Sequence, residues 1–198
     1  MIFKKNRKNT DDYFSGKRIA VLGLGPRNGT THIAISLSNY LSDSRHKRVC
    51  LAEHNRHGDL VELIRVLGSD MSMREYSYHR VTYIPFFSDR DSMPEIEYDC
   101  MVFDFGSDFM RNMNIVNLCD IKIAVGMDAP WRKTEYAILK DLTGRSGSSS
   151  SWRLFVNLGN PAYLEEKDIY GIDSGCFPFE PDPMYPCRET ITFLEDIL

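Results

Sequence analysis

The chain has 198 residues, a net charge of −4 and a hydrophobic content of 42%. This length suits one globular domain with a sizeable core, and the acidic balance argues against a protein that coats nucleic acid. No apolar run approaches the roughly 18 residues of a membrane-spanning helix, and the five scattered cysteines, without a Cys-x-x-Cys pair, indicate the reducing cytoplasm rather than a disulfide framework.

Residues 1–16 are rich in basic side chains, with no apolar run that would make them a signal peptide. The charged residues are Lys4, Lys5, Arg7 and Lys8 against Asp11 and Asp12. We predict that residues 1–16 form a basic flexible tail and that residues 17–198 form the domain.

Apolar runs alternate with helical patterns along the rest of the chain, which is typical of a parallel sheet covered by helices. Strands are predicted at 18–24, 48–53, 80–86, 99–105, 121–127 and 152–157. Helices are predicted at 31–41, 59–67, 108–118, 130–142 and 188–198. Several strands are continuously apolar, so we expect them to be buried on both faces. The sequence therefore predicts a single α/β domain with a mostly parallel, twisted sheet and helices on both faces.

Two segments read as irregular. Residues 144–151, Gly-Arg-Ser-Gly-Ser-Ser-Ser-Ser, predict a flexible loop within the domain. Residues 160–186 are rich in Pro, Gly and Asp, and we expect loops there with one short strand near 176–179. The last helix carries Glu189, Glu195 and Asp196. Anionic lipid repels such a helix, so it should pack on the sheet.

A glycine-bearing loop separates the first strand from the first helix. It contains Gly23, Gly25 and Gly29 and leads into Thr30 and Thr31. A loop of this kind at a helix N-terminus directs backbone N–H groups at one point, where a phosphate can bind. The usual phosphate loop ends in Gly-Lys-Ser/Thr, and the lysine position here holds Thr30.

Polar residues also follow three later strands. They are Glu53, His54, Asn55, His57 and Asp59 after the second strand, Asp104 after the fourth, and Asn157 after the sixth. The carboxyl ends of parallel strands share one edge of the sheet, so these side chains should converge beside the glycine loop. His54 and His57 also suggest a metal, but the sequence offers no further convergent ligand set.

The order of these motifs resembles the ParA/MinD-type nucleotide-binding proteins, a branch of the P-loop NTPases. Four segments carry the resemblance: Gly29-Thr30-Thr31, the switch-like Glu53-His54-Asn55-Arg56-His57-Gly58, the Walker-B-like stretch from Tyr98 to Asp104, and Phe155-Val156-Asn157. It implies ATP or ADP with Mg²⁺ as ligand. The nucleotide-binding residues it implies are Gly25, Arg27, Asn28, Gly29, Thr30, Thr31, Asn55, Asp104 and Asn157, with Thr31 and Asp104 on the Mg²⁺ side.

Several positions depart from that family. Thr30 stands at the position of the family's phosphate-loop lysine, and Gly25 stands at the position of its signature lysine. Asn55 stands where the family has the switch aspartate that assists hydrolysis. Arg27 could supply a replacement charge. The resemblance to divergent TadZ/CpaE-like members implies a pseudo-ATPase that self-associates and binds a protein partner in pilus or secretion assembly, with weak or absent nucleotide binding and no efficient catalysis.

Two alternatives stay open. One is a slow Mg²⁺-dependent ATPase of the same family. The other is an NAD(P)-dependent oxidoreductase, because Gly23-x-Gly25-x-x-x-Gly29 is close to a Rossmann fingerprint. Glu53 would then bind a ribose, and Tyr136 and Lys140 would form an acid/base pair.

Overall fold

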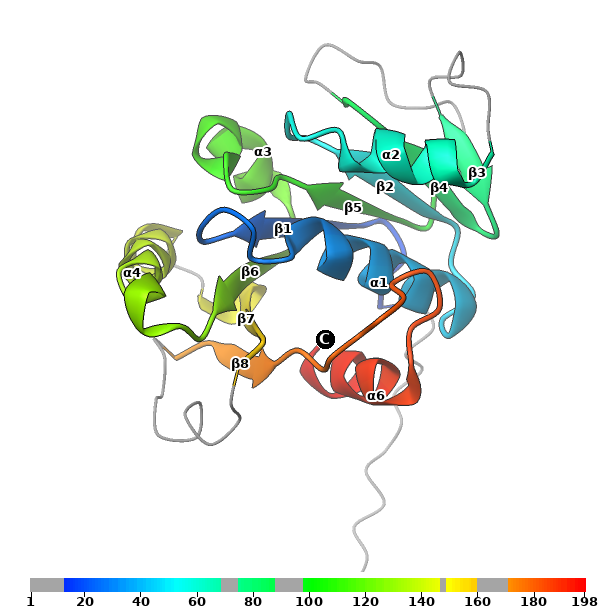
Figure 1. The fold of residues 1–198 in the computed structure, drawn as a ribbon. Coiled ribbons are helices and arrows are strands. Elements are labelled where there is room, and N and C mark those ends of the chain that lie inside the picture. Colours follow the sequence, from blue (N-terminus) through cyan, green and yellow to red (C-terminus); the bar gives the residue numbers. More distant parts are fainter. Residues whose placement is uncertain (1–12, 69–74, 88–97, 147–148, 160–170) are drawn as a thin grey trace, which may run out of the picture.

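A central eight-stranded sheet carries the fold in a computed structural model, which describes residues 13–68, 75–87, 98–146, 149–159 and 171–198 (Figure 1). The strands are β1 (Lys17–Gly23), β2 (Val49–Glu53), β3 (Tyr76–Tyr78), β4 (Val81–Ile84), β5 (Cys100–Asp104), β6 (Ile121–Met127), β7 (Trp152–Asn157) and β8 (Asp173–Cys176). Their order is β3-β4-β2-β5-β1-β6-β7-β8. Every pair is parallel except β3–β4. The predicted α/β class, with a mostly parallel sheet in a single domain, is confirmed.

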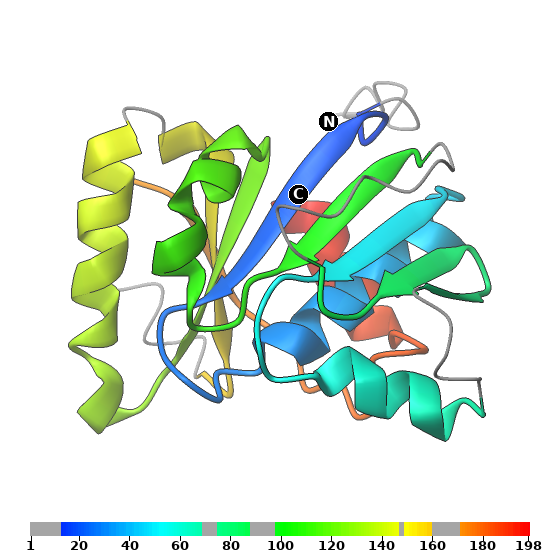
Figure 2. The same ribbon diagram turned by 90° about the horizontal axis from the view of Figure 1, so that it is seen from above.

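Helices cover both faces of the sheet. They are α1 (Thr30–Asp43), α2 (Asp59–Val66), α3 (Met113–Leu118), α4 (Glu135–Ser146) and α6 (Arg188–Ile197). Helices α1, α2 and α6 lie on one face, and α3 and α4 lie on the other (Figure 2). Strand β1 alternates between the two core layers, since Ile19 and Val21 pack toward α1 while Ala20 and Leu22 pack toward α4. The sheet is thus buried on both faces, as its continuous apolar runs predicted.

The neighbours of β1 decide between two kinds of nucleotide fold. Strand β1 pairs with β5 through Val21 and Asp104 and with β6 through Leu22 and Ala124. In the dinucleotide-binding fold of oxidoreductases the first strand lies beside the second. Here β5 separates β1 from β2. The strand order therefore disagrees with the oxidoreductase alternative.

The sheet edges differ from the prediction. Strand β3 was not predicted, because it has three residues and no glycine turn marks it. It forms an antiparallel hairpin with β4, with His79 in the left-handed conformation at φ 53°. The short strand expected at 176–179 lies earlier, as β8. A Cβ on Gly175 of β8 would overlap the Phe193 ring, so this glycine lets α6 pack closely on the strand.

The prediction of a flexible loop at 144–151 is wrong for most of these residues. Helix α4 continues to Ser146, and a 3₁₀ turn at Ser149–Ser151 leads into β7. Leu139, Leu142 and Trp152 are buried in one cluster, so packing holds the last turn of the helix despite its glycine. The helix expected at 130–142 begins instead with a 3₁₀ turn, Pro130–Arg132, as does the one expected at 108–118.

Both ends of the described chain touch the core. Residues 1–12 of the predicted tail lie outside the described residues, but Phe14 is buried in the layer that contains α1. Leu194 of α6 is buried in the same layer, so the acidic last helix does pack on the sheet. Among the helices that the structure describes, none has the length and hydropathy to cross a membrane.

Candidate functional site

The loop at residues 24–29 and the ends of β2 and β5 meet at one edge of the sheet. The Thr31 hydroxyl, in the first turn of α1, donates to Asp104 Oδ2 at 2.6 Å and lies 3.1 Å from Asp59 Oδ2. Asp104 ends β5, and Asp59 begins α2 after β2. The structure thus brings together the predicted pair of Thr31 and Asp104. A hydroxyl and a carboxylate at a helix N-terminus are ligands suited to Mg²⁺ beside a phosphate.

The loop needs glycine where it turns into α1. Gly29 has φ 83°, and a Cβ there would overlap the Asn157 side-chain amide. Asn157 Nδ2 donates to the Asn28 carbonyl at 3.1 Å. Asn157, which the resemblance places near a nucleotide base, therefore braces the loop from β7.

Replacing Gly29 by alanine is expected to lower the free energy of unfolding by about 1–3 kcal/mol, because a left-handed residue would gain a Cβ against a fixed amide. Urea denaturation measures this. Gly144→Ala is the matched control, since it lies within α4 and no described atom is within 4 Å of its added Cβ. That change should stabilise the protein by about 0.5–1 kcal/mol. Equal effects at both glycines would contradict the constraint on the loop.

Both ends of the Asn55 side-chain amide are hydrogen-bonded to backbone groups. Its Nδ2 donates to the Asp104 carbonyl at 3.2 Å, and its Oδ1 accepts the His57 N–H at 2.8 Å. The residue is buried. A neutral amide held at both ends shapes the turn after β2, and it offers no carboxylate to a water molecule.

Two fully buried carboxylates lie at this edge, Asp104 bonded to Thr31 and Glu53 bonded to the Asp59 N–H. Burial raises the pKa of Asp104, although the Thr31 hydroxyl and the Gly106 N–H counteract part of this shift. Burial also raises the pKa of Glu53, to about 7, and the charges of Asp104 and Asp59 add to the effect. Glu53 Oε1 accepts the Asp59 N–H at 2.8 Å. Its Oε2 has no hydrogen-bond partner among the described residues. This excess of negative charge suits a proton or a divalent cation.

The described side chains do not form a metal centre by themselves, since no group of three His, Cys, Asp or Glu residues is placed to hold an ion. The buried His54 ring packs against Phe105 and Phe87, with centroids 5.2 and 5.9 Å away, and His57 is exposed. A cation at Thr31 and Asp104 would therefore need water and phosphate oxygens as further ligands, which is how Mg²⁺ is usually bound.

The charge fixed beside the loop differs from the predicted one. Arg27 is exposed, with φ 60°. Arg132, after β6, instead contacts the loop. Its Nη1 donates to the Pro26 carbonyl at 2.9 Å and to Asn28 Oδ1 at 3.1 Å, and it pairs with Glu135 Oε1 at 2.7 Å.

Glu135 closes the same network. Its Oε2 accepts the Asn28 Nδ2 at 3.2 Å, and Asn28 also donates to the Val125 carbonyl at 3.1 Å. A Cβ on Gly25 would overlap the Glu135 carboxylate. A side chain at Gly25, the position that the resemblance aligns with a signature lysine, would therefore have to displace the Glu135 carboxylate. The sequence places Arg132 and Glu135 three residues apart, but it carries no sign that they reach the loop.

The oxidoreductase residues do not form the expected site. Tyr136 is partly buried, its hydroxyl lies 2.6 Å from where a Cβ on Gly126 would be, and desolvation raises its pKa to about 12. An acid/base tyrosine needs a pKa nearer the working pH. The full burial of Glu53 also keeps its carboxylate from a ribose.

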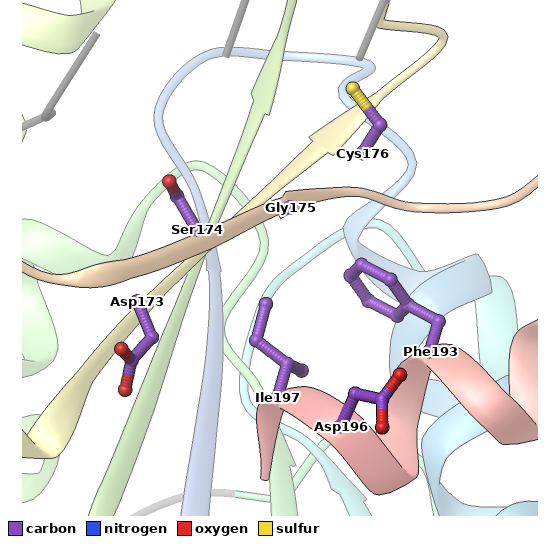
Figure 3. Close-up of a pocket in the computed structure, with 7 residues that line it drawn as sticks. All are labelled: Asp173, Ser174, Gly175, Cys176, Phe193, Asp196 and Ile197. Carbon is purple, nitrogen blue, oxygen red and sulfur yellow. The ribbon is translucent and has the colours of Figure 1, made fainter. Parts of the chain in front are cut away.

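A separate cavity of about 440 Å³ lies between β8 and α6 (Figure 3). It is lined by Asp173–Cys176 of β8 and by Phe193, Asp196 and Ile197 of α6. Strands β6 and β7 separate β8 from β1, and none of the predicted site residues lines this cavity.

No protein-family model matches the sequence, and no curated protein is significantly similar to it. Solved structures do match. A plasmid partition protein from Borrelia burgdorferi bound to AMPPNP is 14% identical with a TM-score of 0.63, over 92% of this chain and 100% of that chain. A ParA family ATPase from Chlorobium tepidum is 15% identical with a TM-score of 0.61, over 93% and 92%.

The MinD chain of a MinC:MinD cell division complex from Aquifex aeolicus is 14% identical with a TM-score of 0.63, over 91% of this chain and 96% of that chain. At these identities the likeness concerns the fold. The strand order, the glycine loop between β1 and α1, and these matches agree: the chain has the fold of the ParA and MinD ATPases.

Proposed function

We propose that this chain is a pseudo-ATPase, which binds an adenine nucleotide weakly at the loop of residues 24–29 and does not hydrolyse it efficiently. The observation that carries the proposal is that one sheet edge keeps the groups suited to Mg²⁺ but lacks the groups suited to hydrolysis. The Thr31–Asp104 pair is intact at 2.6 Å, while position 30 lacks a lysine and Asn55 is hydrogen-bonded to backbone at both ends.

The residues present fit a phosphate group. The turn at Gly29 has no room for a side chain, and the first N–H groups of α1 follow it. Thr31 and Asp104 would hold Mg²⁺, with the other ligands coming from water and phosphate. Mg²⁺ bound there would neutralise phosphate charge. The AMPPNP in the Borrelia neighbour supports an adenine nucleotide as the ligand.

The same residues make rapid turnover unfavourable. Phosphoryl transfer depends on positioning and on charge neutralisation. The absence of a lysine and of a switch carboxylate should raise the barrier by several kcal/mol, at about tenfold in rate for each 1.4 kcal/mol. A slow Mg²⁺-dependent ATPase is the outcome that the experiment below must separate from this proposal.

Exposed apolar side chains support a protein-binding role. Phe86, Met110, Trp131 and Leu158 follow β4, β5, β6 and β7, and each is more than half exposed, with Trp131 at 78%. Each therefore lies after the carboxyl end of a strand, at the edge of the sheet where the candidate site is. Apolar groups gathered on a surface are typical of an interface. We infer that the chain self-associates and binds a protein partner there, as a cytoplasmic localisation or assembly factor of the kind that serves a pilus or secretion system.

The test is thermal stability with ADP, ATP or NADH, each with and without Mg²⁺, together with an assay of phosphate release. A ligand that binds the native state raises the melting temperature. Support would be a shift with adenine nucleotides and little phosphate release. Phosphate release at ordinary ATPase rates, or no shift with any nucleotide, would overturn the proposal.

Asp104→Asn is expected to weaken Mg²⁺-nucleotide binding by about tenfold, which is the scale for loss of a metal-orienting group. Binding of nucleotide without Mg²⁺ should change little. Isothermal titration calorimetry measures both. Asp141→Asn on the exposed side of α4 is the control, and it should bind as the wild type does. Equal weakening with and without Mg²⁺ would argue against a cation at Asp104.

A further inference from the structure

A charged pair fastens the phosphate loop to the chain that follows β6. The pair is Arg132 and Glu135, whose side chains are each 18% exposed and lie 2.7 Å apart. Arg132 donates to the Pro26 carbonyl and to Asn28 Oδ1. Glu135 accepts from Asn28 Nδ2, and its carboxylate fills the space that a Cβ on Gly25 would need. Side chains that follow β6 therefore fix the position of the loop.

Arg132 keeps hydrogen-bonding capacity after these contacts. Its Nη1 makes all the bonds named above. A guanidinium has further N–H donors on Nε and Nη2, and these have no partner within the described ranges of the chain. Planar, permanently charged donors of this kind match a phosphate group well.

The loop itself offers no comparable cation. Thr30 is uncharged and buried, and Arg27 is exposed and is itself in the left-handed conformation. Glu135 offsets the charge of Arg132 and orients it through Asn28.

We propose that Arg132 is the cation for the phosphate groups of a nucleotide on this loop, supplied by the β6–α4 connection in place of the lysine missing at position 30. Glu135 is then a positioning residue that holds Arg132 against the loop and reduces its attraction for anions. This inference rests on the proposed function, because it assigns a further residue to the same site.

The experiment measures binding of pyrophosphate and of ADP by calorimetry in three full-length variants. Arg132→Ala should weaken both by about tenfold or more. Glu135→Gln should tighten both by several-fold, because its one amide oxygen can still accept from Arg132 Nη1 and keep the guanidinium at the loop, while the contact with Asn28 Nδ2 and the competing negative charge are lost. Arg27→Ala tests whether the exposed arginine of the loop carries the charge instead, and it should cost far less affinity than Arg132→Ala. The melting temperature without ligand is recorded for each variant.

The opposite signs separate a charge role from a merely structural one. If the pair only stiffens the loop, Arg132→Ala and Glu135→Gln should weaken binding alike, and this result would overturn the inference. Loss of binding in Arg27→Ala alone, or absence of binding in all variants, would overturn it as well. Nucleotide binding that ignores Arg132 would leave the proposed function standing. Binding seen in Glu135→Gln but not in the wild type would support the role of Arg132 and contradict the proposed function.

Discussion

Thr30→Lys is expected to tighten binding of ADP and ATP by about 10- to 100-fold, the scale of one or two charge-assisted hydrogen bonds to phosphate. Thr30 is the first residue of α1, and its hydroxyl lies 2.6 Å from where a Cβ on Gly23 would be. A lysine at that position starts at the N-terminus of α1, beside the loop that we propose binds phosphate. The change in affinity is read by calorimetry with each nucleotide.

The matched control is Thr30→Met, which gives a side chain of similar length without the charge. If the loop is a phosphate site, methionine should leave the affinity unchanged or lower it while lysine raises it. Phosphate release should stay slow in Thr30→Lys, because the neutral Asn55 still lacks the carboxylate that assists hydrolysis. Equal affinities for the two variants would count against the whole assignment of the loop.

The central sheet and the core of the site were predictable from the sequence for one physical reason. Parallel strands buried on both faces are continuously apolar, so β1, β2, β5, β6 and β7 stand out from the chain. Their carboxyl ends must share an edge, which made the meeting of Thr31 with Asp104 predictable. The glycine requirement at position 29 follows from the turn between strand and helix.

Features that depend on tertiary packing could not be predicted in this way. Strand β3 is three residues long, and β8 is polar and half-buried, so neither has a distinct pattern. Helix α4 continues past Gly144, and Leu142 before it and Trp152 after it are buried in the same core cluster. The contact of Arg132 and Glu135 with the loop joins segments about a hundred residues apart, which a local pattern does not report.

Asn55 and Asn157 show how a correct position can carry a different role. Both were expected to lie near a nucleotide, and both do lie at the loop edge of the sheet. In each, the side-chain Nδ2 donates to a backbone carbonyl, that of Asp104 for Asn55 and that of Asn28 for Asn157. The residue type fixes the hydrogen-bonding groups, but only the fold decides which partners are nearest.

Glu53→Gln is expected to flatten the dependence of stability on pH. The pKa of Glu53 is raised from 4.5 to about 7, mainly by burial and secondarily by the charges of Asp104 and Asp59. The native state therefore binds this proton more tightly than the unfolded state does. The resulting stability is fully present below about pH 4.5 and is lost as the pH rises through 7. The neutral amide has no charge to bury, so the variant should be more stable at pH 8, by on the order of 2 kcal/mol.

Urea denaturation at pH 5, 6, 7 and 8 measures the free energy of unfolding in both proteins. Glu62→Gln is the control, because Glu62 lies on α2 with its side chain 65% exposed and paired with Arg65. Some slope should remain in Glu53→Gln, since burial raises the pKa of Asp104 in the same direction. If Glu53→Gln and the wild type lose stability equally between pH 5 and 8, Glu53 is not the buried acid that governs this edge. Added Mg²⁺ should reduce the wild-type slope if a cation at Thr31 and Asp104 offsets the same charge, which ties this measurement to the proposed ligand.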